Sequence, residues 1–341
     1  MSVYPEGFDD WPLARRNEHF AAEARRHRER KGAGPILEKR AGQAPYVPAY
    51  QWSLKVLDAE QFLAEKFPPR TLMLPPWLPD KGLAMVFAPR GVGKTWFALA
   101  AAHAVATGGE FLRWRAPRPR RVLYIDGEMP AAALQARYLA VVDSAGIELA
   151  PENLRLLAAD IQRDGLPDLA DAEAQQFYEP AIAGAELIVV DNLSTIARGL
   201  RENEADAFAP VQTWLLGQRA AGRSVLLVHH AGKGGSQRGT SRKEDVLDTV
   251  VSLSRPPGYS AAEGARFEVR FTKSRGFWGE EAEPFEARFA DRRWSTAAIV
   301  AEDGDEALAA LRAEGLSIRA IAERTGLSKS EVARRLKEGG K

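Results

Sequence analysis

Residues 88 to 95 combine the residue types that bind the phosphates of a nucleotide. The segment reads Ala88-Pro89-Arg90-Gly91-Val92-Gly93-Lys94-Thr95, with alanine where the strict pattern has its first glycine. The two glycines let successive backbone N–H groups face phosphate oxygens, the lysine adds positive charge, and the threonine offers a hydroxyl to magnesium. We therefore expect ATP and Mg2+ as cofactors, bound by Ala88, Pro89, Arg90, Gly91, Val92, Gly93, Lys94, Thr95 and Trp96.

Carboxylates follow two apolar segments further along the chain. Asp191 ends the run 187–190 and is expected to hold magnesium together with Thr95. Glu128 comes just after the run 122–126 and is predicted to orient the water that attacks the γ-phosphate. Asp126 is the alternative for that base, unless it only ends its strand.

A pair of histidines closes the next apolar run. His230 stands where a side chain is expected to touch the γ-phosphate and to pass its presence to the glycine-rich segment that follows. The same role is less strongly indicated for His229. For either residue, the alternative is a buried histidine with a structural role. The chain has no cysteine, and no other histidine lies nearby in sequence, so a transition-metal site is not expected.

These residues need a scaffold that brings the ends of several strands together. Short runs rich in Val, Leu and Ile alternate with helical stretches, which predicts a doubly wound α/β fold with its ligand at the carboxyl ends of the strands. The expected strands are 83–88, 122–126, 187–191 and 225–229, and the expected helices are 95–107, 131–145, 171–183 and 205–220. Residues 266–272 and 284–289 are predicted to form an antiparallel hairpin.

Taken in order, these features resemble the RecA-like ATPases, and within them the hexameric helicases of the RepA and DnaB type. The resemblance covers residues 75–293 and rests on Glu128, on His229-His230 with Lys233-Gly234, and on Arg238-Gly239-Thr240-Ser241. It implies a RecA-like, mostly parallel sheet with an antiparallel C-terminal hairpin. The long N-terminal helical domain of the replicative members is replaced by a short arm.

The resemblance also bears on Thr272-Lys273-Ser274-Arg275. In that family a Lys-x-Arg at this place reaches the ATP bound by the neighbouring subunit, so Lys273 and Arg275 are expected to stabilise the phosphoryl transition state in trans. An exposed basic turn is the alternative. The implied assembly is a homo-oligomer, a hexameric ring, with Lys94, Glu128, His230, Lys273 and Arg275 as catalytic residues.

Two further segments indicate DNA contacts. The loops 195–207 and 231–244 are expected to line the centre of the ring, and the second carries Lys233, Arg238, Arg242 and Lys243 for the backbone of single-stranded DNA. A solvated loop is the alternative. Residues 316–336 have the pattern of a helix-turn-helix, with Lys329, Arg334 and Arg335 facing a major groove. A helical hairpin that only mediates protein contacts is the alternative.

The composition indicates the general kind of protein and its compartment. The 341 residues carry a net charge of +1, so DNA binding rests on local segments and not on global charge. The absence of cysteine, of a signal peptide and of an apolar run of about twenty residues predicts a cytoplasmic protein without a membrane partner. The expected parts are a polar arm (1–50), a proline-rich lead-in (51–80), the RecA-like ATPase domain (81–298) and an all-α helix-turn-helix domain (303–341).

The leading functional hypothesis is an ATP- and Mg2+-dependent motor, a RepA-type helicase that acts on single-stranded DNA as a ring and hydrolyses ATP to ADP and phosphate. The tail would recruit it to duplex DNA. The alternative is a nucleotide-gated, oligomeric DNA-binding regulator that does not unwind. A small-molecule kinase is a third, weaker alternative, because no acceptor lid is recognisable.

Overall fold

The computed structural model describes residues 55–147, 152–200, 205–231, 244–299, 305–313, 315–325 and 327–338. The chain divides into two compact units, Met1–Phe67 and Pro68–Lys341. The described part of the first unit contains α2 (Ala59–Ala64), whose N-terminus is capped by the Asp58 carboxylate, which accepts a hydrogen bond from the Gln61 N–H at 2.8 Å. The polar arm predicted for 1–50 lies outside the described residues.

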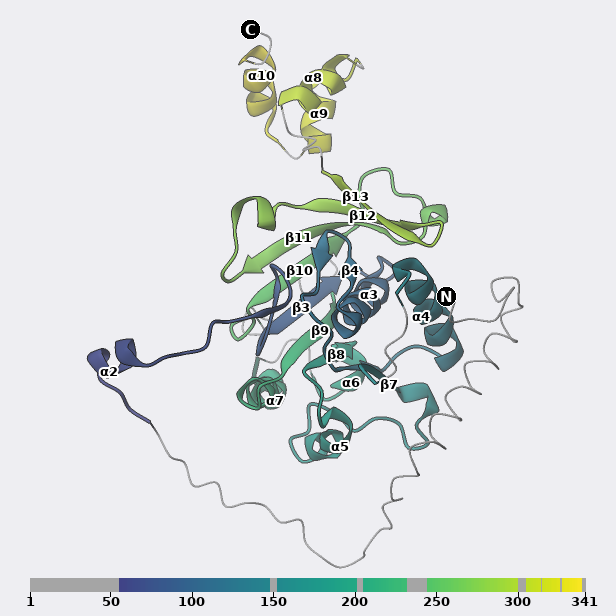
Figure 1. The fold of residues 1–341 in the computed structure, drawn as a ribbon. Coiled ribbons are helices and arrows are strands. Elements are labelled where there is room, and N and C mark those ends of the chain that lie inside the picture. The colour runs from purple at the N-terminus through teal and green to yellow at the C-terminus, as the bar shows by residue number, and fades with distance from the viewer. Residues whose placement is uncertain are drawn as a thin grey trace, which may run out of the picture. The chain divides into compact units, whose positions relative to one another are not determined.

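A nine-stranded sheet forms the centre of the second unit (Figure 1). From one edge to the other, its strands are β13 (Arg293–Ala298), β12 (Phe285–Ala290), β11 (Arg266–Ser274), β10 (Thr249–Ser254), β3 (Leu83–Ala88), β9 (Ser224–His230), β8 (Leu187–Asp191), β6 (Val122–Asp126) and β7 (Leu154–Ala158). The strands from β10 to β7 are parallel to their neighbours. The prediction of a mostly parallel sheet is confirmed.

The antiparallel part of the sheet is larger than predicted. The expected hairpin is present as β11 and β12, but β13 adds a further antiparallel strand beyond it. On the other side, β10 pairs antiparallel with β11 and parallel with β3, so it joins the two halves of the sheet. The prediction missed β13 because most of its side chains are exposed and it lacks an apolar run.

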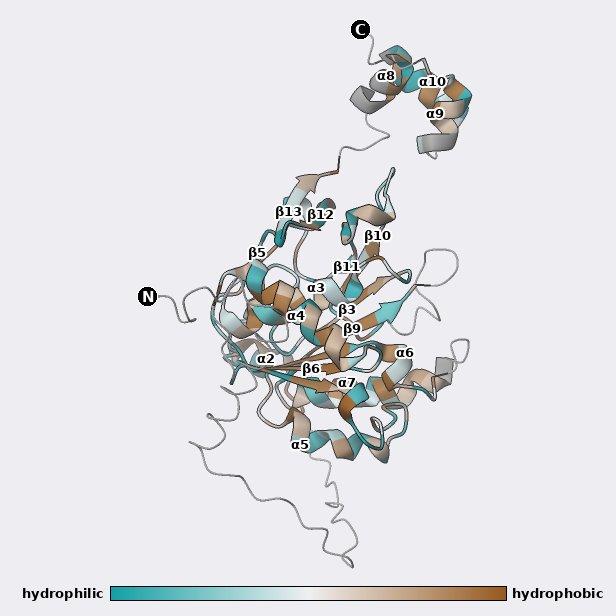
Figure 2. Cartoon of the chain, turned by 90° about the vertical axis from the view of Figure 1, so that its right-hand side faces the viewer, coloured by the Kyte–Doolittle hydropathy of each residue, from teal (hydrophilic) through white to brown (hydrophobic). Residues whose placement is uncertain are grey.

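Helices cover both faces of the parallel strands, as a doubly wound fold requires (Figure 1). On one face, Ala84 and Val86 belong to the same apolar cluster as α3 (Lys94–Thr107) and α4 (Ala131–Ala145). On the other, Met85 and Phe87 belong to the cluster that includes α5 (Glu179–Ile182), α6 (Leu193–Ile196) and α7 (Ala209–Ala220). The strands β3, β6 and β9 accordingly appear mostly hydrophobic in Figure 2.

Two predicted helices are interrupted, and in each case a shorter α-helix begins close to a proline. The stretch expected as one helix over 171–183 holds the 3-10 turn Ala174–Tyr178 and the short α5, with Pro180 in the first turn of α5. The stretch expected over 205–220 opens as the 3-10 turn Ala205–Phe208, and α7 begins one residue before Pro210. Proline has no N–H to donate to the preceding turn, so it is tolerated only at such a beginning.

Short elements complete the unit. The strands β1 (Leu72–Leu74) and β2 (Leu78–Pro79) pair with each other, as do β4 (Glu110–Phe111) and β5 (Trp114–Arg115), and the remaining 3-10 turns are Ala159–Ile161, Ala261–Glu263 and Gly279–Ala282. Among the described residues, no helix combines the length and the apolar character needed to cross a bilayer.

The C-terminal residues form three short helices, α8 (Asp305–Ala313), α9 (Ile318–Thr325) and α10 (Lys329–Glu338). They share a small core of Leu308, Leu311, Ile321, Ala322 and Val332. The hydroxyls of Ser317 and Ser328 accept N–H groups three residues on, at 3.2 Å each, and so cap α9 and α10. The two predicted helices are present with α8 as a third, and the helix-turn-helix assignment stays a prediction.

A buried ion-pair network ties the segment after β5 to the sheet. Arg120, 8% exposed, donates to Asp80 at 2.5 Å and to Glu186 at 2.9 Å. Glu186 also accepts the backbone N–H of Arg121 at 3.1 Å. Arg120 is thus a buried cation between two acids.

Replacing Arg120 with alanine is expected to destabilise the fold by about 2–4 kcal/mol, because two partly buried carboxylates would lose their shared cation. Urea denaturation of the purified protein measures the change. Arg115→Ala is the matched control, because the pair that Arg115 forms with Glu110 is exposed on both sides, and it should cost at most about 1 kcal/mol. Equal losses for the two variants would contradict the assignment.

Candidate functional site

The loop between β3 and α3 has the backbone geometry of a phosphate-binding loop. Gly91 has φ of 76° and Gly93 has φ of 128°, values that side chains other than hydrogen rarely allow. A Cβ on Gly93 would also lie 2.9 Å from the Phe267 ring. Gly93 is the N-cap of α3, so the loop presents the N-terminus of a 14-residue helix to a ligand.

Lys94 lies inside this loop. Its ammonium donates to the carbonyls of Ala88 at 3.1 Å and Pro89 at 3.0 Å. Burial lowers the pKa of Lys94, while the charges of Asp191 and Glu128 act in the opposite direction. Ala88 and Pro89 therefore contribute carbonyls that position the lysine, and they do not line the adjoining cavity.

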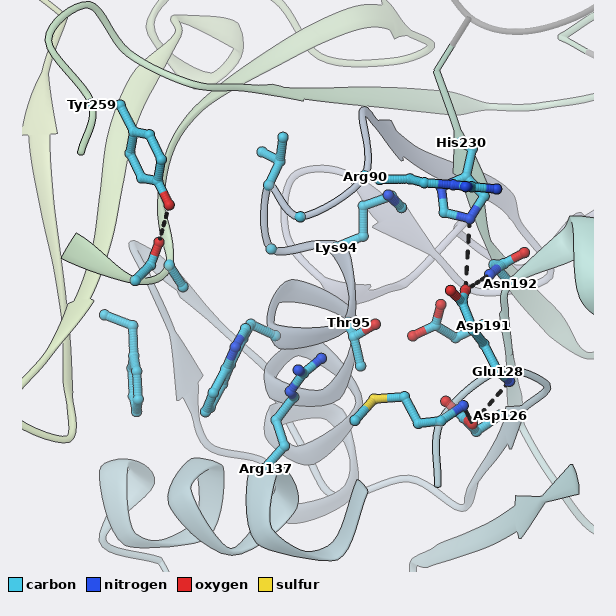
Figure 3. A pocket seen from close by; sticks show the side chains of 18 residues that line it. Arg90, Lys94, Thr95, Asp126, Glu128, Arg137, Asp191, Asn192, His230 and Tyr259 are labelled. Atoms are coloured by element: carbon cyan, nitrogen blue, oxygen red, sulfur yellow. Dashed lines mark hydrogen bonds and ion pairs between the residues drawn. The ribbon is translucent and has the colours of Figure 1, made fainter. Parts of the chain in front are cut away.

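A cavity of about 550 Å³ opens in front of the loop (Figure 3). It brings together most of the residues predicted for nucleotide and metal binding: Arg90, Gly91, Val92, Gly93, Lys94, Thr95, Trp96, Glu128, Asp191 and His230. They come from the ends of β3, β6, β8 and β9, which is the edge where a doubly wound sheet binds its ligands.

Asp191 and Thr95 form the polar floor of the cavity. Asp191 is 3% exposed, and its carboxylate accepts hydrogen bonds from the Tyr124 hydroxyl at 2.6 Å and from the Thr95 hydroxyl. Burial raises the pKa of Asp191, against the opposing effect of those two hydroxyls and of Lys94.

These two residues fit a magnesium ion. A hydroxyl and a carboxylate lie side by side, both of them oxygen donors of the kind that Mg2+ prefers. The described residues contain no cluster of three or more His, Asp or Glu side chains arranged to hold a metal by themselves. The ion would thus take its remaining ligands from water and phosphate, as is usual for Mg2+ in nucleotide sites.

Glu128 points from the turn after β6 toward two polar side chains (Figure 3). Its Oε2 lies 3.6 Å from His230 Nε2 and accepts a short hydrogen bond from the Asn192 amide. His229 sits on β9 beside Phe87, is 2% exposed and does not line the cavity. Of the two histidines, only His230 is placed at the site.

Asp126, the alternative base, also lines the cavity, but one of its oxygens is bonded to the backbone that follows it. Its Oδ1 accepts the N–H groups of Glu128 at 3.2 Å and Met129 at 2.7 Å, which turns the chain after β6. Its Oδ2 is buried and has no hydrogen-bond partner among the described residues. Burial raises the pKa of Asp126 from 3.8 to about 6.

The far wall of the cavity is aromatic and was largely missed by the sequence. The Trp96 and Phe289 rings lie 4.8 Å apart, and the Arg137 guanidinium lies 5.2 Å from the Trp96 ring. The Tyr259 hydroxyl donates to the Gly264 carbonyl at 2.9 Å. Only Trp96 was predicted; Arg137, Tyr259 and Phe289 are far from the loop in sequence and no local pattern marks them. Asn192 was also missed, although it directly follows Asp191.

The structure does not bring the remaining predicted residues to this cavity. Lys273 and Arg275, at the end of β11 and just beyond it, donate to the carbonyls of Glu244 and Asp245 and do not line the cavity. Arg334 pairs with Glu331 at 2.6 Å on α10, the helix that also carries Lys329 and Arg335. The predicted loop residues Lys233, Arg238, Arg242 and Lys243 lie outside the described residues.

The raised pKa of Asp126 predicts a pH dependence of stability. The folded state holds this proton more tightly than the unfolded state, so the free energy of unfolding falls as pH rises from about 4 to above 6. Asp126→Asn removes this titration, so the variant should gain about 3 kcal/mol relative to the parent protein over that window. Urea denaturation at several pH values measures the difference. Asp171→Asn, on an exposed turn, is the control, and identical pH profiles for the parent and Asp126→Asn would contradict the prediction.

Comparison with known proteins agrees with this geometry. The family model AAA_25, described as an AAA domain, matches residues 49–236, just over half of the chain. No curated protein matches the sequence. A KaiC-like protein from the hyperthermophilic archaeon Pyrococcus horikoshii OT3 aligns with a TM-score of 0.45 and 14% identity, over 66% of this chain and 93% of that one. The chain belongs to the AAA_25 family of AAA domains.

Proposed function

We propose that this ATPase is a ring-forming motor of the RepA helicase type, which hydrolyses ATP with Mg2+ while bound to single-stranded DNA. The observation that carries the proposal is the placement of Glu128: its carboxylate shares one cavity with Lys94 and Thr95 of the phosphate loop and is held there by polar side chains. A nucleotide-binding protein without hydrolysis needs no such carboxylate beside the γ-phosphate.

Each of these residues has a separate role in the proposed hydrolysis. Backbone N–H groups from Gly91 to Thr95 surround the phosphates, and Lys94 offers positive charge to the β- and γ-phosphate oxygens. Held at Thr95 and Asp191, Mg2+ would neutralise charge on the same oxygens. Glu128 accepts a proton from the attacking water. The water oxygen forms a bond to the γ-phosphorus as the bond between that phosphorus and the ADP oxygen breaks. The products are ADP and phosphate.

The nucleoside would lie against the aromatic wall. Trp96 and Phe289 pack against each other and bring aromatic surface to the cavity, where Arg137 supplies a cation beside Trp96. Tyr259, which belongs to this wall, lies on the opposite side of Thr95 from Glu128 (Figure 3). A nucleotide that extends along the cavity therefore has its base at one end and its γ-phosphate at the end that holds Glu128.

Assembly into a ring is supported by where the basic pair lies. Lys273 and Arg275 are next to Glu244 and Asp245 and outside their own cavity, so they would act on a nucleotide only if it belonged to another copy. We assign them that role in trans. The segments predicted to hold single-stranded DNA, 195–207 and 231–244, follow directly after the strands that carry Asp191 and His230. The C-terminal helices, with Lys329, Arg334 and Arg335, would bind duplex DNA.

Replacement of Glu128 by glutamine should lower the turnover number for ATP by about 100-fold or more, because the amide no longer accepts a proton. Binding of ATP should remain, since no phosphate contact is removed. Steady-state phosphate release and titration with a fluorescent ATP analogue measure the two quantities. Lys94→Ala is the reference variant and should lose binding. Normal turnover by Glu128→Gln would move the base to Asp126.

Single-stranded DNA should raise the ATPase rate severalfold and should be displaced from a partial duplex in an ATP-dependent manner. The rate is measured with and without DNA, and light scattering with a non-hydrolysable nucleotide gives the mass of the assembly. Lys94→Ala controls for contaminating ATPases. Hydrolysis that does not respond to DNA, without strand displacement, would reject the helicase and favour the nucleotide-gated regulator. A mass that stays at 37.4 kDa would reject the ring.

A further inference from the structure

We propose that Asn192 is a positioning residue, which holds one oxygen of the Glu128 carboxylate so that the other faces the attacking water. This inference rests on the proposed ATP hydrolysis. Asn192 directly follows Asp191, and its side-chain amide donates to Glu128 Oε2 (Figure 3). It is 1% exposed, so the contact is built into the protein interior.

The orientation of the Asn192 amide is set by its position at the start of α6. Its Oδ1 accepts the backbone N–H groups of Ser194 at 3.0 Å and Thr195 at 3.3 Å, which makes Asn192 the N-cap of that helix. The reversed amide would aim its N–H groups at these two donors. The oxygen therefore faces the helix, and the NH2 group faces Glu128.

A close approach of two backbones brings Asn192 and Glu128 together. The Gly127 N–H donates to the Asp191 carbonyl at 2.7 Å. A Cβ on Gly127 would lie 2.6 Å from both Thr195 Oγ1 and Ile196 Cγ1, so only glycine fits between β6 and α6. Glu128, the residue after this glycine, therefore lies beside Asn192, the residue that caps α6.

Glu128 needs such support because its side chain is 53% exposed. A glutamate with this freedom loses rotamer entropy when it is fixed for catalysis, and misplacement of a catalytic group by about 1 Å can cost a hundredfold in rate. The Asn192 amide donates to Oε2, and His230 Nε2 lies 3.6 Å from the same oxygen. Oε1 is then the oxygen presented to water.

The primary test is Asn192→Ser, because serine keeps the helix cap and removes only the donor to Glu128. The turnover number for ATP should fall by about 10- to 100-fold, with the KM and the affinity for a fluorescent ATP analogue within about twofold of the parent. Asn153→Ser is the matched control. Asn153 also donates from its amide, to the Ala106 carbonyl at 3.0 Å, but outside the cavity, so its turnover should match the parent.

A double-mutant cycle separates positioning from direct action. In the Glu128→Gln background, Asn192→Ser should change the residual rate by less than about twofold, because a residue that acts only through Glu128 has nothing left to position. A full loss in that background would overturn the proposal, as would normal turnover by Asn192→Ser alone. Should the serine variant fail to fold, Asn192→Asp replaces it: aspartate keeps the cap, places a like charge beside Glu128, and should lower turnover further.

ATP hydrolysis and the role of Asn192 can be rejected separately. If the parent protein does not hydrolyse ATP under any condition, the proposed function falls and the role of Asn192 falls with it. If the parent hydrolyses ATP and Asn192→Ser is indistinguishable from it, only the role of Asn192 is rejected.

Discussion

The site depends on how three carboxylates share one edge of the sheet. Asp126, Glu128 and Asp191 come from the ends of two neighbouring strands, and two of them are almost fully buried. Burial raises the pKa of Asp126 and of Asp191, and it lowers the pKa of Lys94, the cation placed among them. Such a cluster is costly unless positive charge reaches it. A magnesium ion bound at Thr95 and Asp191 would supply that charge, so the burial of these carboxylates favours the binding of a cation.

The fold explains why these groups meet. Parallel strands with helices on both faces place all their carboxyl ends on one edge, and the phosphate loop leaves the same edge from β3. The apolar alternation of Ala84 and Val86 against Met85 and Phe87 fixes which face receives α3. Because α3 is buried along nearly its whole length, its N-terminus cannot shift without disturbing the core. The loop geometry is thus anchored by packing remote from the nucleotide.

The sequence was most informative where a local pattern of residues is compatible with only one structure. Continuous runs of Val, Leu and Ile identify β3, β6 and β8, and Gly91, Gly93, Lys94 and Thr95 identify the loop. The edge strands β7 and β13 were missed because exposed positions interrupt their apolar residues, and β10 was also missed, because its serine and threonine residues break up the apolar run. Phe289 and Tyr259 were missed for another reason: they join the site only because the antiparallel strands fold back over α3, and that tertiary contact leaves no local trace.

The polar contacts of Glu128 connect the reacting group to two predicted DNA segments. His230 ends β9 and stands just before 231–244, while Asn192 caps α6 at the start of 195–207. One carboxylate oxygen of Glu128 therefore contacts residues that lie just before the two segments. A displacement of either segment by DNA would change the position of that oxygen, and a γ-phosphate that draws Glu128 toward it would pull on both segments. Reciprocity of this kind is required of any coupling between two sites. Under the proposed mechanism this coupling needs no long pathway, because Glu128, the proposed base, contacts Asn192 and His230, which lie just before the two segments.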